Sequence, residues 1–466
     1  MKNKILFLVD HKHRDLPSLA LISYFLNNMG CKSKLVALGA YDETIKSFYP
    51  DFIVLPKPNH DFEKVMSWKL KGIKVVILDS EGNNQDIAFS YKIRIKPDVY
   101  LFWNDIEKNK YLYLSNTFNT HLKTLGYYRS DFLYPPMHEL YDSKRKILAR
   151  LSLNHKQPTL TIASSFQETF LSAERFKNKE KKRKSSLKGT DYRILIENDN
   201  KLRLLTENLI KILLNKYPNL NIVIKPHPHE NVVYWNNFIK SLNNSNLKLL
   251  VGEPINILFQ ISDFHIAKNA CTTTVESRLY GIKSLELHTD KSIKFIPKKH
   301  FLSNYIATNT QQAICVIDSV LFNRNVYKSE SLKNNNDVDS YCKKHLYKFD
   351  GLRCFEYAKY FVALANGKMV NPNRATIRKT LDDLKNIGLY FIVLIRKRIN
   401  NSLHRQSKLE TQVNNPTAEN DRPTSELKGH LVDREYGLFD NRIKKGDEIP
   451  WFKKFDKNKH IQNLIK

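Results

Sequence analysis

One stretch of the sequence combines a buried strand with side chains that can bind an anion. Residues 221–231 read N-I-V-I-K-P-H-P-H-E-N. The β-branched residues predict a strand over Asn221–Ile224, and the two prolines that follow permit neither further ladder pairing nor a helix. The chain must therefore leave the sheet carrying Lys225 and His227. Ligands bind at the carboxyl ends of strands in open α/β sheets, so we expect these side chains in a ligand site.

The chemistry of such a pair suits a departing phosphate. When an activated sugar loses its nucleotide, negative charge builds on the phosphate, and a cation or N–H donor stabilises that charge. Lys225 and His227 offer these groups on a loop whose motion Pro228 limits. The alternative for His227 is a structural role as a cap of the next helix. His229 and Glu230 are interpreted as the residues that begin that helix.

A second stretch, residues 262–276, repeats this arrangement. It reads S-D-F-H-I-A-K-N-A-C-T-T-T-V-E, which predicts an apolar strand, a turn of small residues and a helix that begins with three hydroxyls. Hydroxyls and free N–H groups at a helix N-terminus can bind phosphate, and the helix dipole assists. Glu276, one turn into the helix, could accept from a ribose hydroxyl. The alternative is that the threonines only cap the helix.

The first half of the chain carries candidate bases. The strand Lys74–Leu78 runs into D-S-E-G-N at residues 79–83. Asp79 or Glu81 could act as general base on an acceptor hydroxyl, because a carboxylate in a cleft can have its pKa raised toward the working range. Arg14-Asp15, after the first strand, would line the same cleft. The alternative is an Asp-Ser turn that caps the next helix.

Two series of alternating strands and helices must position these residues. Such alternation is typical of parallel, doubly wound sheets, so we predict an α/β fold with two lobes. We expect a first lobe over 1–150, a second over 158–340, closing helices over 341–400 and a disordered basic tail over 401–466. The predicted strands are Ile5–Val9, Lys34–Leu38, Phe52–Leu55, Lys74–Leu78, Val99–Trp103, Thr159–Ala163, Asn221–Ile224, Leu247–Val251, Phe264–Ala267 and Lys283–Leu287.

Length and charge narrow the classes of partner. A chain of 466 residues suits two domains. Lys and Arg total 76 against 47 for Asp and Glu, a net charge of +29 that favours nucleic acid, an anionic membrane or a phosphorylated substrate. Part of this excess reflects lysine-rich and asparagine-rich usage. We expect no nucleic-acid partner, because the charge is scattered and no aromatic-basic motif of nucleic-acid readers occurs. Steep, salt-sensitive oligonucleotide binding would restore that alternative.

Cysteine usage and missing motifs bound the location and the cofactors. The five cysteines form no C-x-x-C pair, which argues against a disulfide framework or zinc site and for the cytoplasm. The first apolar run stops at Asp10, so it predicts a strand and not a signal peptide. A Rossmann fingerprint, a P-loop and H-E-x-x-H are absent. We therefore expect metal-independent transfer with no cofactor beyond the substrate's own nucleotide.

One stretch near the C-terminus suggests membrane contact. Within Ile377–Ile399, the apolar residues 389–395 stand directly before R-K-R at 396–398. Seven apolar residues cannot cross a bilayer, but a basic apolar helix can lie on an anionic inner-membrane surface. The alternative is a terminal helix that packs across both lobes.

With these residues in view, the chain resembles the bacterial surface carbohydrate biosynthesis proteins, glycosyltransferases of GT-B architecture with two facing Rossmann-like lobes. The resemblance runs from about Ile5 to Leu364. K-P-H-P is also similar to the His-Pro motif of polysialyltransferases and capsule Kdo transferases, where it contacts the CMP of the donor. The motifs that carry the resemblance are R-D-L at 14–16, L-D-S-E-G-N at 78–83, G-Y-Y-R-S-D at 126–131, K-P-H-P at 225–228, N-A-C-T-T-T-V-E at 269–276 and F-D-G at 349–351.

The resemblance implies a cytoplasmic glycosyltransferase of capsule or lipopolysaccharide synthesis. It would move a sugar from a nucleotide-activated donor, with CMP-linked donors among the candidates, to a glycan or lipid-linked acceptor. A carboxylate-carboxylate-glycine element holds the base in polysialyltransferases, which implies Glu81 here. Expected donor-binding residues are Ser164, Ser165, Lys225, His227, Pro228, Asn269, Thr272, Thr273, Thr274 and Glu276; expected catalytic residues are Glu81, Asp79 and His227; the expected acceptor side holds Arg14 and Asp15.

Two other chemistries stay open. Phosphotransferases of the teichoic acid type use a CDP-linked polyol, also have two Rossmann-like lobes and also carry histidines at strand ends. UDP-sugar 2-epimerases of the two-lobed type act on a UDP-sugar with no acceptor. The response to CMP, CDP and UDP compounds separates these alternatives.

Overall fold

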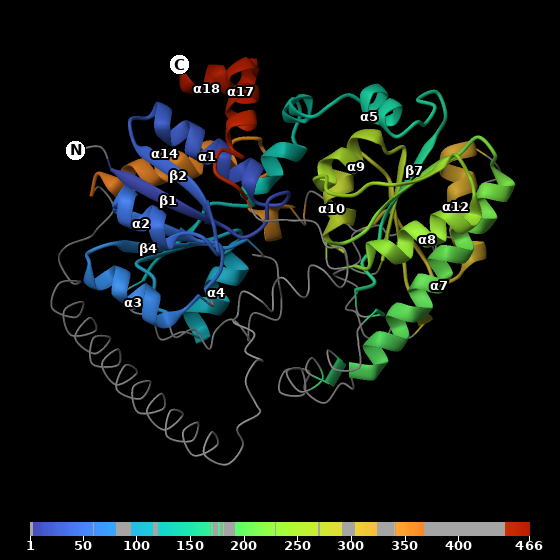
Figure 1. Cartoon of the computed structure of the whole chain (residues 1–466), viewed down its shortest axis with the longest axis horizontal. Coiled ribbons are helices and arrows are strands. Elements are labelled where there is room, and N and C mark those ends of the chain that lie inside the picture. The colour runs from blue at the N-terminus through green and yellow to red at the C-terminus, as the bar shows by residue number, and fades with distance from the viewer. Residues whose placement is uncertain are drawn as a thin grey trace, which may run out of the picture.

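The structure, a computed structural model, folds into two lobes joined side by side (Figure 1). It describes residues 3–58, 60–80, 95–114, 120–167, 169–170, 176–177, 180, 192–228, 230–268, 271–290, 303–323, 340, 342–367 and 443–466. Each lobe is built on a six-stranded sheet whose strand pairs are all parallel. The predicted α/β fold with two Rossmann-like lobes is therefore confirmed.

The first sheet has the order β2-β1-β3-β4-β5-β6. Its strands are apolar runs because helices cover both faces, and β1 is buried from Ile5 to Val9. The strands are β1 (Lys4–Val9), β2 (Lys32–Ala37), β3 (Phe52–Leu55), β4 (Lys74–Leu78), β5 (Val99–Phe102) and β6 (His121–Thr124). The helices between them are α1 (Leu16–Asn28), α2 (Asp42–Phe48), α3 (Phe62–Leu70) and α4 (Asp105–Leu114).

The second sheet has the order β12-β11-β10-β7-β8-β9. The chain starts in the middle, at β7, builds outward through β8 and β9, and then returns to the other side of β7 through β10. The carboxyl ends of β7, β8 and β10 therefore meet at a topological switch point, where open α/β sheets bind ligands. The strands are β7 (Thr159–Ala163), β8 (Asn221–Lys225), β9 (Leu247–Leu249), β10 (Phe264–Lys268), β11 (Ser284–Leu287) and β12 (Tyr305–Ala307). The helices are α7 (Tyr192–Lys216), α8 (Val232–Leu242), α9 (Ile255–Ile261), α10 (Thr272–Leu279) and α12 (Thr310–Phe322).

The chain crosses between the lobes more than once. The 3-10 turns η2 (Tyr128–Leu133) and η3 (Met137–Leu140) and helix α5 (Lys144–Arg150) lead from the first lobe to the second. After a π-helical turn, η6 (Cys342–Leu346), helix α14 (Arg353–Ala365) returns and packs against α1. The first lobe thus uses residues from both ends of the chain.

Two motifs of the family resemblance meet in this return. The carboxylate of Asp131 in η2 accepts hydrogen bonds from Arg353 N (2.9 Å) and Cys354 N (2.7 Å), so it caps α14. Gly126 has φ +97°, and a Cβ there would lie 2.8 Å from Arg353 Cδ. Asp350 of the F-D-G motif holds the Arg353 guanidinium at 2.8 Å. These motifs therefore build the junction of the first lobe with its closing helix, which is a structural role.

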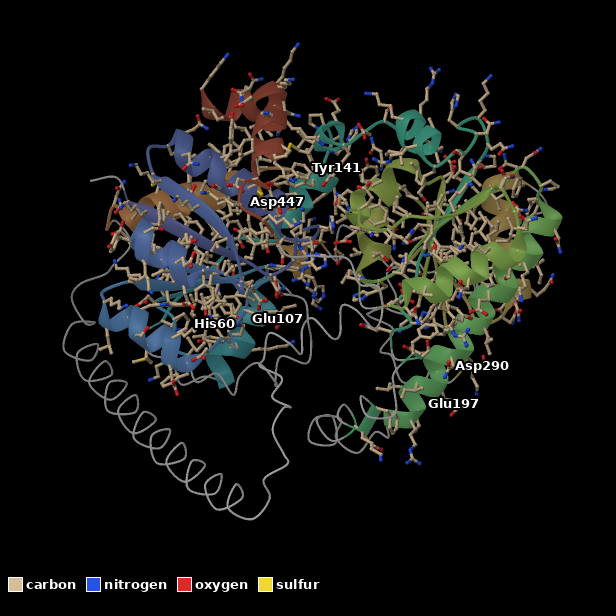
Figure 2. All side chains as sticks on the ribbon, in the orientation of Figure 1. His60, Glu107, Tyr141, Glu197, Asp290 and Asp447 are labelled. Carbon is tan, nitrogen blue, oxygen red and sulfur yellow. The ribbon has the colours of Figure 1, made fainter. Side chains whose placement is uncertain are left out.

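The tail prediction needs a correction. Residues 449–465 form two helices, α17 (Ile449–Lys457) and α18 (Lys459–Ile465), where we expected disorder over 401–466. Phe455 and Ile461 are fully buried against the first lobe, and the ring of Trp451 lies 5.6 Å from that of Tyr141. Figure 2 shows Tyr141 near these helices. The apolar residues are few but spaced for one helical face, and that face is covered. Residues 401–442 lie outside the described residues.

Two edge strands and a predicted membrane helix remain to be compared with the structure. The edge strands β6 and β12 were missed, because they are short and only partly buried. The proposed membrane helix at 377–399 lies outside the described residues. Within the part of the chain that is described, no helix is long and apolar enough to cross a bilayer.

Candidate functional site

A buried carboxylate joins the two main loops of the second lobe. Glu230 accepts hydrogen bonds from Ser164 Oγ (2.7 Å), Phe166 N (2.7 Å) and His227 N (2.6 Å). Ser164 follows β7 and His227 follows β8, so one side chain fixes both strand ends relative to each other. Burial raises the pKa of Glu230, which is fully enclosed. Sequence reasoning gave Glu230 only the start of a helix and missed this connection.

Lys225 and His13 show that the two lobes present charge to each other. Lys225 ends β8, and burial lowers its pKa to about 8 while Glu253 opposes the shift. His13 lies in the loop after β1, and its pKa is lowered to about 4 by burial and by the charges of Lys225 and Lys12. The charge of Lys225 is therefore felt at a residue of the first lobe. The lowered pKa reports that burial penalises the charged form of Lys225, which is still mostly protonated at neutral pH.

The three threonines of α10 point in different directions. Thr272 is exposed and Thr273 is half-buried. Thr274 is buried, and its hydroxyl donates to the Cys271 carbonyl (2.7 Å) or to Glu286 Oε1 (2.9 Å). Of the three hydroxyls, those of Thr272 and Thr273 are therefore on the more accessible side of the helix start, and that of Thr274 is used inside the lobe. The side chain of Cys271, at the N-cap, makes no capping hydrogen bond.

A second lysine lies at this edge. Lys268 ends β10, and its ammonium group donates to the Ser165 carbonyl (2.6 Å) and pairs with Asp199 of α7 (2.8 Å). Ser165 therefore contributes its carbonyl oxygen to a contact with β10. Asn269, the next predicted donor residue, lies outside the described residues.

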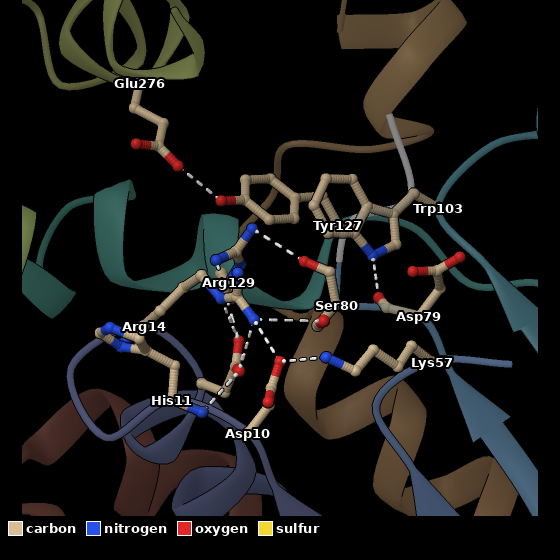
Figure 3. Close-up of polar contacts among 11 residues, drawn as sticks. Asp10, His11, Arg14, Lys57, Asp79, Ser80, Trp103, Tyr127, Arg129 and Glu276 are labelled. Atoms are coloured by element: carbon tan, nitrogen blue, oxygen red, sulfur yellow. Dashed lines mark hydrogen bonds and ion pairs between the residues drawn. The ribbon is translucent and has the colours of Figure 1, made fainter. Parts of the chain in front are cut away.

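Glu276 reaches across to the first lobe. Its Oε1 accepts a hydrogen bond of 2.6 Å from the hydroxyl of Tyr127 (Figure 3). Burial raises the pKa of Tyr127, so the phenol keeps its proton and donates it. The Tyr127 ring packs on Trp103 with centroids 4.2 Å apart, and the Arg129 guanidinium lies 5.0 Å from the Tyr127 ring. The predicted ribose acceptor thus has a first-lobe partner in this state of the protein.

An ion-pair cluster occupies the carboxyl edge of the first sheet (Figure 3). Arg14 donates to Asp15 Oδ1 (2.9 Å) and contacts Asp10 Oδ2 (3.3 Å) and Ser80 Oγ (3.3 Å). Lys57 donates to Asp10 at 3.1 Å. Arg14 is 29% exposed and Asp15 is enclosed, so the arginine faces the space between the lobes and the carboxylate supports it. The predicted acceptor-side pair therefore divides into a surface group and a buried counterion.

Asp79 lies beside this cluster. Its carboxylate accepts from the hydroxyl of Tyr100 at 2.9 Å, and its carbonyl accepts from Trp103 Nε1 at 2.7 Å. Glu81, the other candidate base, lies outside the described residues. Across the described part of the chain, no three His, Cys, Asp or Glu side chains gather as a metal site.

Several residues at the lobe interface were not singled out from the sequence. They share a position at the carboxyl end of a strand or within five residues after it, which is the signal that could have identified them. They are Asp10 and His13 after β1, Lys57 after β3, Trp103 after β5, Tyr127 and Arg129 after β6, and Lys268 at the end of β10.

Comparison with known proteins identifies relatives by fold. No family model and no curated protein sequence matches this chain. Three solved structures share a TM-score of 0.50 and 11% sequence identity with it: MnaA of S. aureus with UDP, a putative UDP-N-acetylglucosamine 2-epimerase from Listeria monocytogenes, and the wall teichoic acid polymerase TagF. They cover 78%, 80% and 79% of this chain and 97%, 99% and 90% of their own. The chain has a GT-B-like fold. At this identity the similarity concerns the fold alone.

Proposed function

We propose that this protein is a nucleotide-sugar-dependent glycosyltransferase of surface polysaccharide synthesis. The observation that carries the proposal is that the carboxyl edges of the two sheets face each other. Lys225 of the second lobe lies close enough to His13 of the first to lower its pKa. Glu276 and Tyr127 meet across the same boundary. A reaction between a donor on one lobe and an acceptor on the other would take place there.

The second lobe would hold the donor. Lys225 and His227 lie at the end of β8, and Thr272 and Thr273 follow β10; these two strands flank β7, so groups from both could share one phosphate. Glu230 holds the His227 backbone in place. Charge that builds on the leaving phosphate would be stabilised by these donors. Glu276 would accept from a ribose hydroxyl.

The first lobe would hold the acceptor and the base. Asp79, or Glu81 just beyond it, would take the proton from the acceptor hydroxyl as the sugar is transferred. Arg14, backed by Asp15, would contact the acceptor's polar groups. The acceptor is a glycan or a lipid-linked glycan of capsule or lipopolysaccharide, and the basic stretch 377–399 would keep the enzyme at the inner membrane surface.

The fold relatives support a nucleotide-linked substrate. One of the structures that share the fold was solved with UDP, and another is named as a wall teichoic acid polymerase. The proposal therefore includes UDP, CDP and CMP as candidate donor nucleotides, with the sugar to be found by assay.

The test is a transfer assay with a panel of nucleotide sugars. Wild type is expected to release nucleotide with one donor class, faster when acceptor glycan is present. His227→Ala is expected to lower turnover at least tenfold with the fold intact, because a donor to the leaving phosphate is lost. His155→Ala, an exposed histidine of the connector, serves as the control. Unchanged kinetics in His227→Ala would remove this histidine from the mechanism.

A second candidate, a UDP-sugar 2-epimerase, is favoured by one observation. The Listeria monocytogenes structure, named as a putative UDP-N-acetylglucosamine 2-epimerase, shares this fold over 99% of its own length. An epimerase would interconvert two UDP-sugars with no acceptor, whereas a transferase would release nucleotide. Stabilisation by CDP-glycerol alone would instead indicate a polyol phosphotransferase. The same assay, run with and without acceptor, separates the three.

A further inference from the structure

A row of buried hydrogen bonds leads from β7 to the N-terminus of α10. The hydroxyl of Ser262 lies 2.7 Å from that of Thr161, and Thr161 Oγ1 lies 3.0 Å from Nδ1 of His265. On the other side of the ring, Nε2 lies 3.3 Å from Oγ1 of Thr273. One imidazole on β10 therefore joins the interior of the second lobe to a hydroxyl of the candidate donor site.

The geometry indicates where the protons lie. The Thr273 hydroxyl donates its proton to the sulfur of Cys271, so the bond between Thr273 and Nε2 needs an N–H on the ring. This tautomer leaves Nδ1 as the acceptor, and Thr161 then accepts from Ser262. Thr161 then gives its own proton to Nδ1, and a neutral imidazole carries its proton on Nε2. The Nε2–H donates to Thr273 Oγ1, which accepts through a lone pair and keeps its own proton as a donor.

The proton of Thr273 has a weak partner in this state. Its hydroxyl donates to the sulfur of Cys271 at 3.2 Å, and a thiol sulfur is a poor acceptor. A phosphate oxygen accepts far more strongly, because a hydrogen bond to a charged group is roughly twice as strong as a neutral one. Rotation of the Thr273 hydroxyl from the sulfur to a phosphate oxygen would therefore exchange a weak hydrogen bond for a stronger one.

Packing alone does not explain why a histidine occupies position 265. The side chain is fully buried and its ring lies 5.3 Å from that of Phe259, a place that an apolar residue could fill without needing polar partners. Burial lowers the pKa of His265 to about 3, so the ring stays neutral and serves as a fixed donor and acceptor at neutral pH.

We propose that His265 is a positioning residue for the donor phosphate, orienting the Thr273 hydroxyl so that its proton points at a phosphate oxygen of a nucleotide. This inference rests on the proposed function, because it assigns Thr273 to the phosphate. The ligand class is a nucleoside mono- or diphosphate, alone or linked to a sugar.

Two substitutions separate the two faces of the ring. The amide of an asparagine reaches only the position of Nδ1, whereas that of a glutamine reaches the position of Nε2. His265→Asn is therefore expected to keep the contact with Thr161 and to lose the one with Thr273. His265→Gln is expected to restore the contact with Thr273. Both place one amide in the same buried space, so each controls for the stability cost of the other.

The measurement is the Kd of UDP, CDP and CMP for the full-length chain by calorimetry. The comparison uses the nucleotide that wild type binds most tightly. Its Kd is expected to rise about tenfold in Thr273→Val, which removes the charge-assisted hydrogen bond, and in His265→Asn, which leaves the hydroxyl unoriented. In His265→Gln the Kd is expected to stay within about threefold of wild type. The double variant of His265→Asn and Thr273→Val is expected to bind no more weakly than either single variant, because both remove the same interaction.

The outcomes distinguish this inference from the function on which it rests. If wild type binds none of the nucleotides, the proposed function fails and the positioning role fails with it. If Thr273→Val binds nucleotide more weakly than wild type but His265→Asn binds as wild type, only the positioning role is overturned. The same holds if His265→Asn and His265→Gln lose affinity equally. If His265→Asn does not fold, the near-isosteric Thr161→Val leaves Nδ1 without its donor, and unchanged affinity there would overturn the inference.

Discussion

Two buried carboxylates show how single residues shape this protein. Asp131 accepts from the backbone N–H groups of Arg353 and Cys354, which are distant in the chain. Glu230 accepts from the N–H of Phe166, which is also distant, and from that of His227 on its own loop. Asp131 caps α14, and Glu230 fixes the loop that carries His227. An isolated carboxylate is costly to bury, so these residues hold local geometry at an energetic cost.

Asp131 gives a prediction about pH. Burial raises its pKa from 3.8 to about 6, so between these values the folded state holds a proton that the unfolded state has lost. Unfolding free energy must then fall as pH rises through this window, by about 3 kcal/mol in total. Asp131→Asn, which does not titrate, is expected to lack this decline although it is less stable overall. Urea denaturation from pH 4 to 7 measures both; parallel curves would contradict the assignment.

Glu230 gives a prediction about the candidate site. Glu230→Ala leaves the Ser164 hydroxyl and the N–H groups of Phe166 and His227 without their acceptor. Each unpaired buried donor costs about 1–3 kcal/mol, so the expected loss of stability is at least about 3 kcal/mol. Urea denaturation checks it, with exposed Glu139→Ala as the control. A loss equal to that of the control would show that the loops hold their positions without this residue.

At the scale of elements, the C-terminal helix pair acts as a cover for the first lobe. The rings of Phe455 and Tyr24 of α1 lie 5.6 Å apart, and the Tyr24 hydroxyl donates to Asp456 at 2.5 Å. Asp447, just before α17, pairs with Lys12 in the loop after β1 at 3.1 Å. That loop also carries His13 and Arg14, so the cover touches the segment that forms one wall of the candidate site (Figure 2).

The cover should be a stabilising part of the fold. Phe455→Ala removes a fully buried ring and is expected to lower unfolding free energy by about 3–5 kcal/mol. Lys453→Ala, on the exposed side of the same helix, is expected to change it by less than about 0.5 kcal/mol. Denaturant unfolding distinguishes them. Equal, small effects would mean that these helices do not pack on the lobe in solution.

At the scale of the whole molecule, hydrogen bonds between described residues connect the two lobes directly. One is the bond between Tyr127 and Glu276, which sits in a small apolar cluster with Trp103 and Val275. The connector residues Ile147 and Leu148 belong to an apolar core cluster that contains residues of both sheets. We call the bond between Tyr127 and Glu276 the clasp. Because the connector joins the lobes through a wide apolar contact and the clasp is a single hydrogen bond, the lobes are expected to open by rotation about the connector.

Removal of the clasp should loosen the lobes. Tyr127→Phe keeps the ring on Trp103 but leaves the buried Glu276 carboxylate without its donor, at a cost of about 1–3 kcal/mol. We expect faster hydrogen exchange in peptides that cover η2 and α10, and no change in β2. Tyr360→Phe is the matched control, because its hydroxyl has no hydrogen-bond partner within the described residues. Unchanged exchange in α10 would show that this contact does not hold the lobes.

The sequence predicted the fold and one side of the candidate site for physical reasons. Strands buried on both faces are apolar runs, so the central strands of both sheets could be recognised, whereas the partly polar edge strand His121–Thr124 could not. Lys225 and His227 could be placed at a strand end because the prolines beside them end the strand. The tie through Glu230 and the clasp at Tyr127 could not be predicted, because both join segments that only the folded topology brings together.

The crossings of the chain between the lobes determine the order in which the two lobes can be completed during synthesis. Residues 159–307 contain every strand of the second sheet, so that sheet can assemble as soon as this stretch has left the ribosome. The first sheet emerges earlier, but α14 and α17, which pack against α1, follow the second sheet in the chain. The outer side of α1 therefore gains its apolar cover only after the strands of the second sheet have been synthesised.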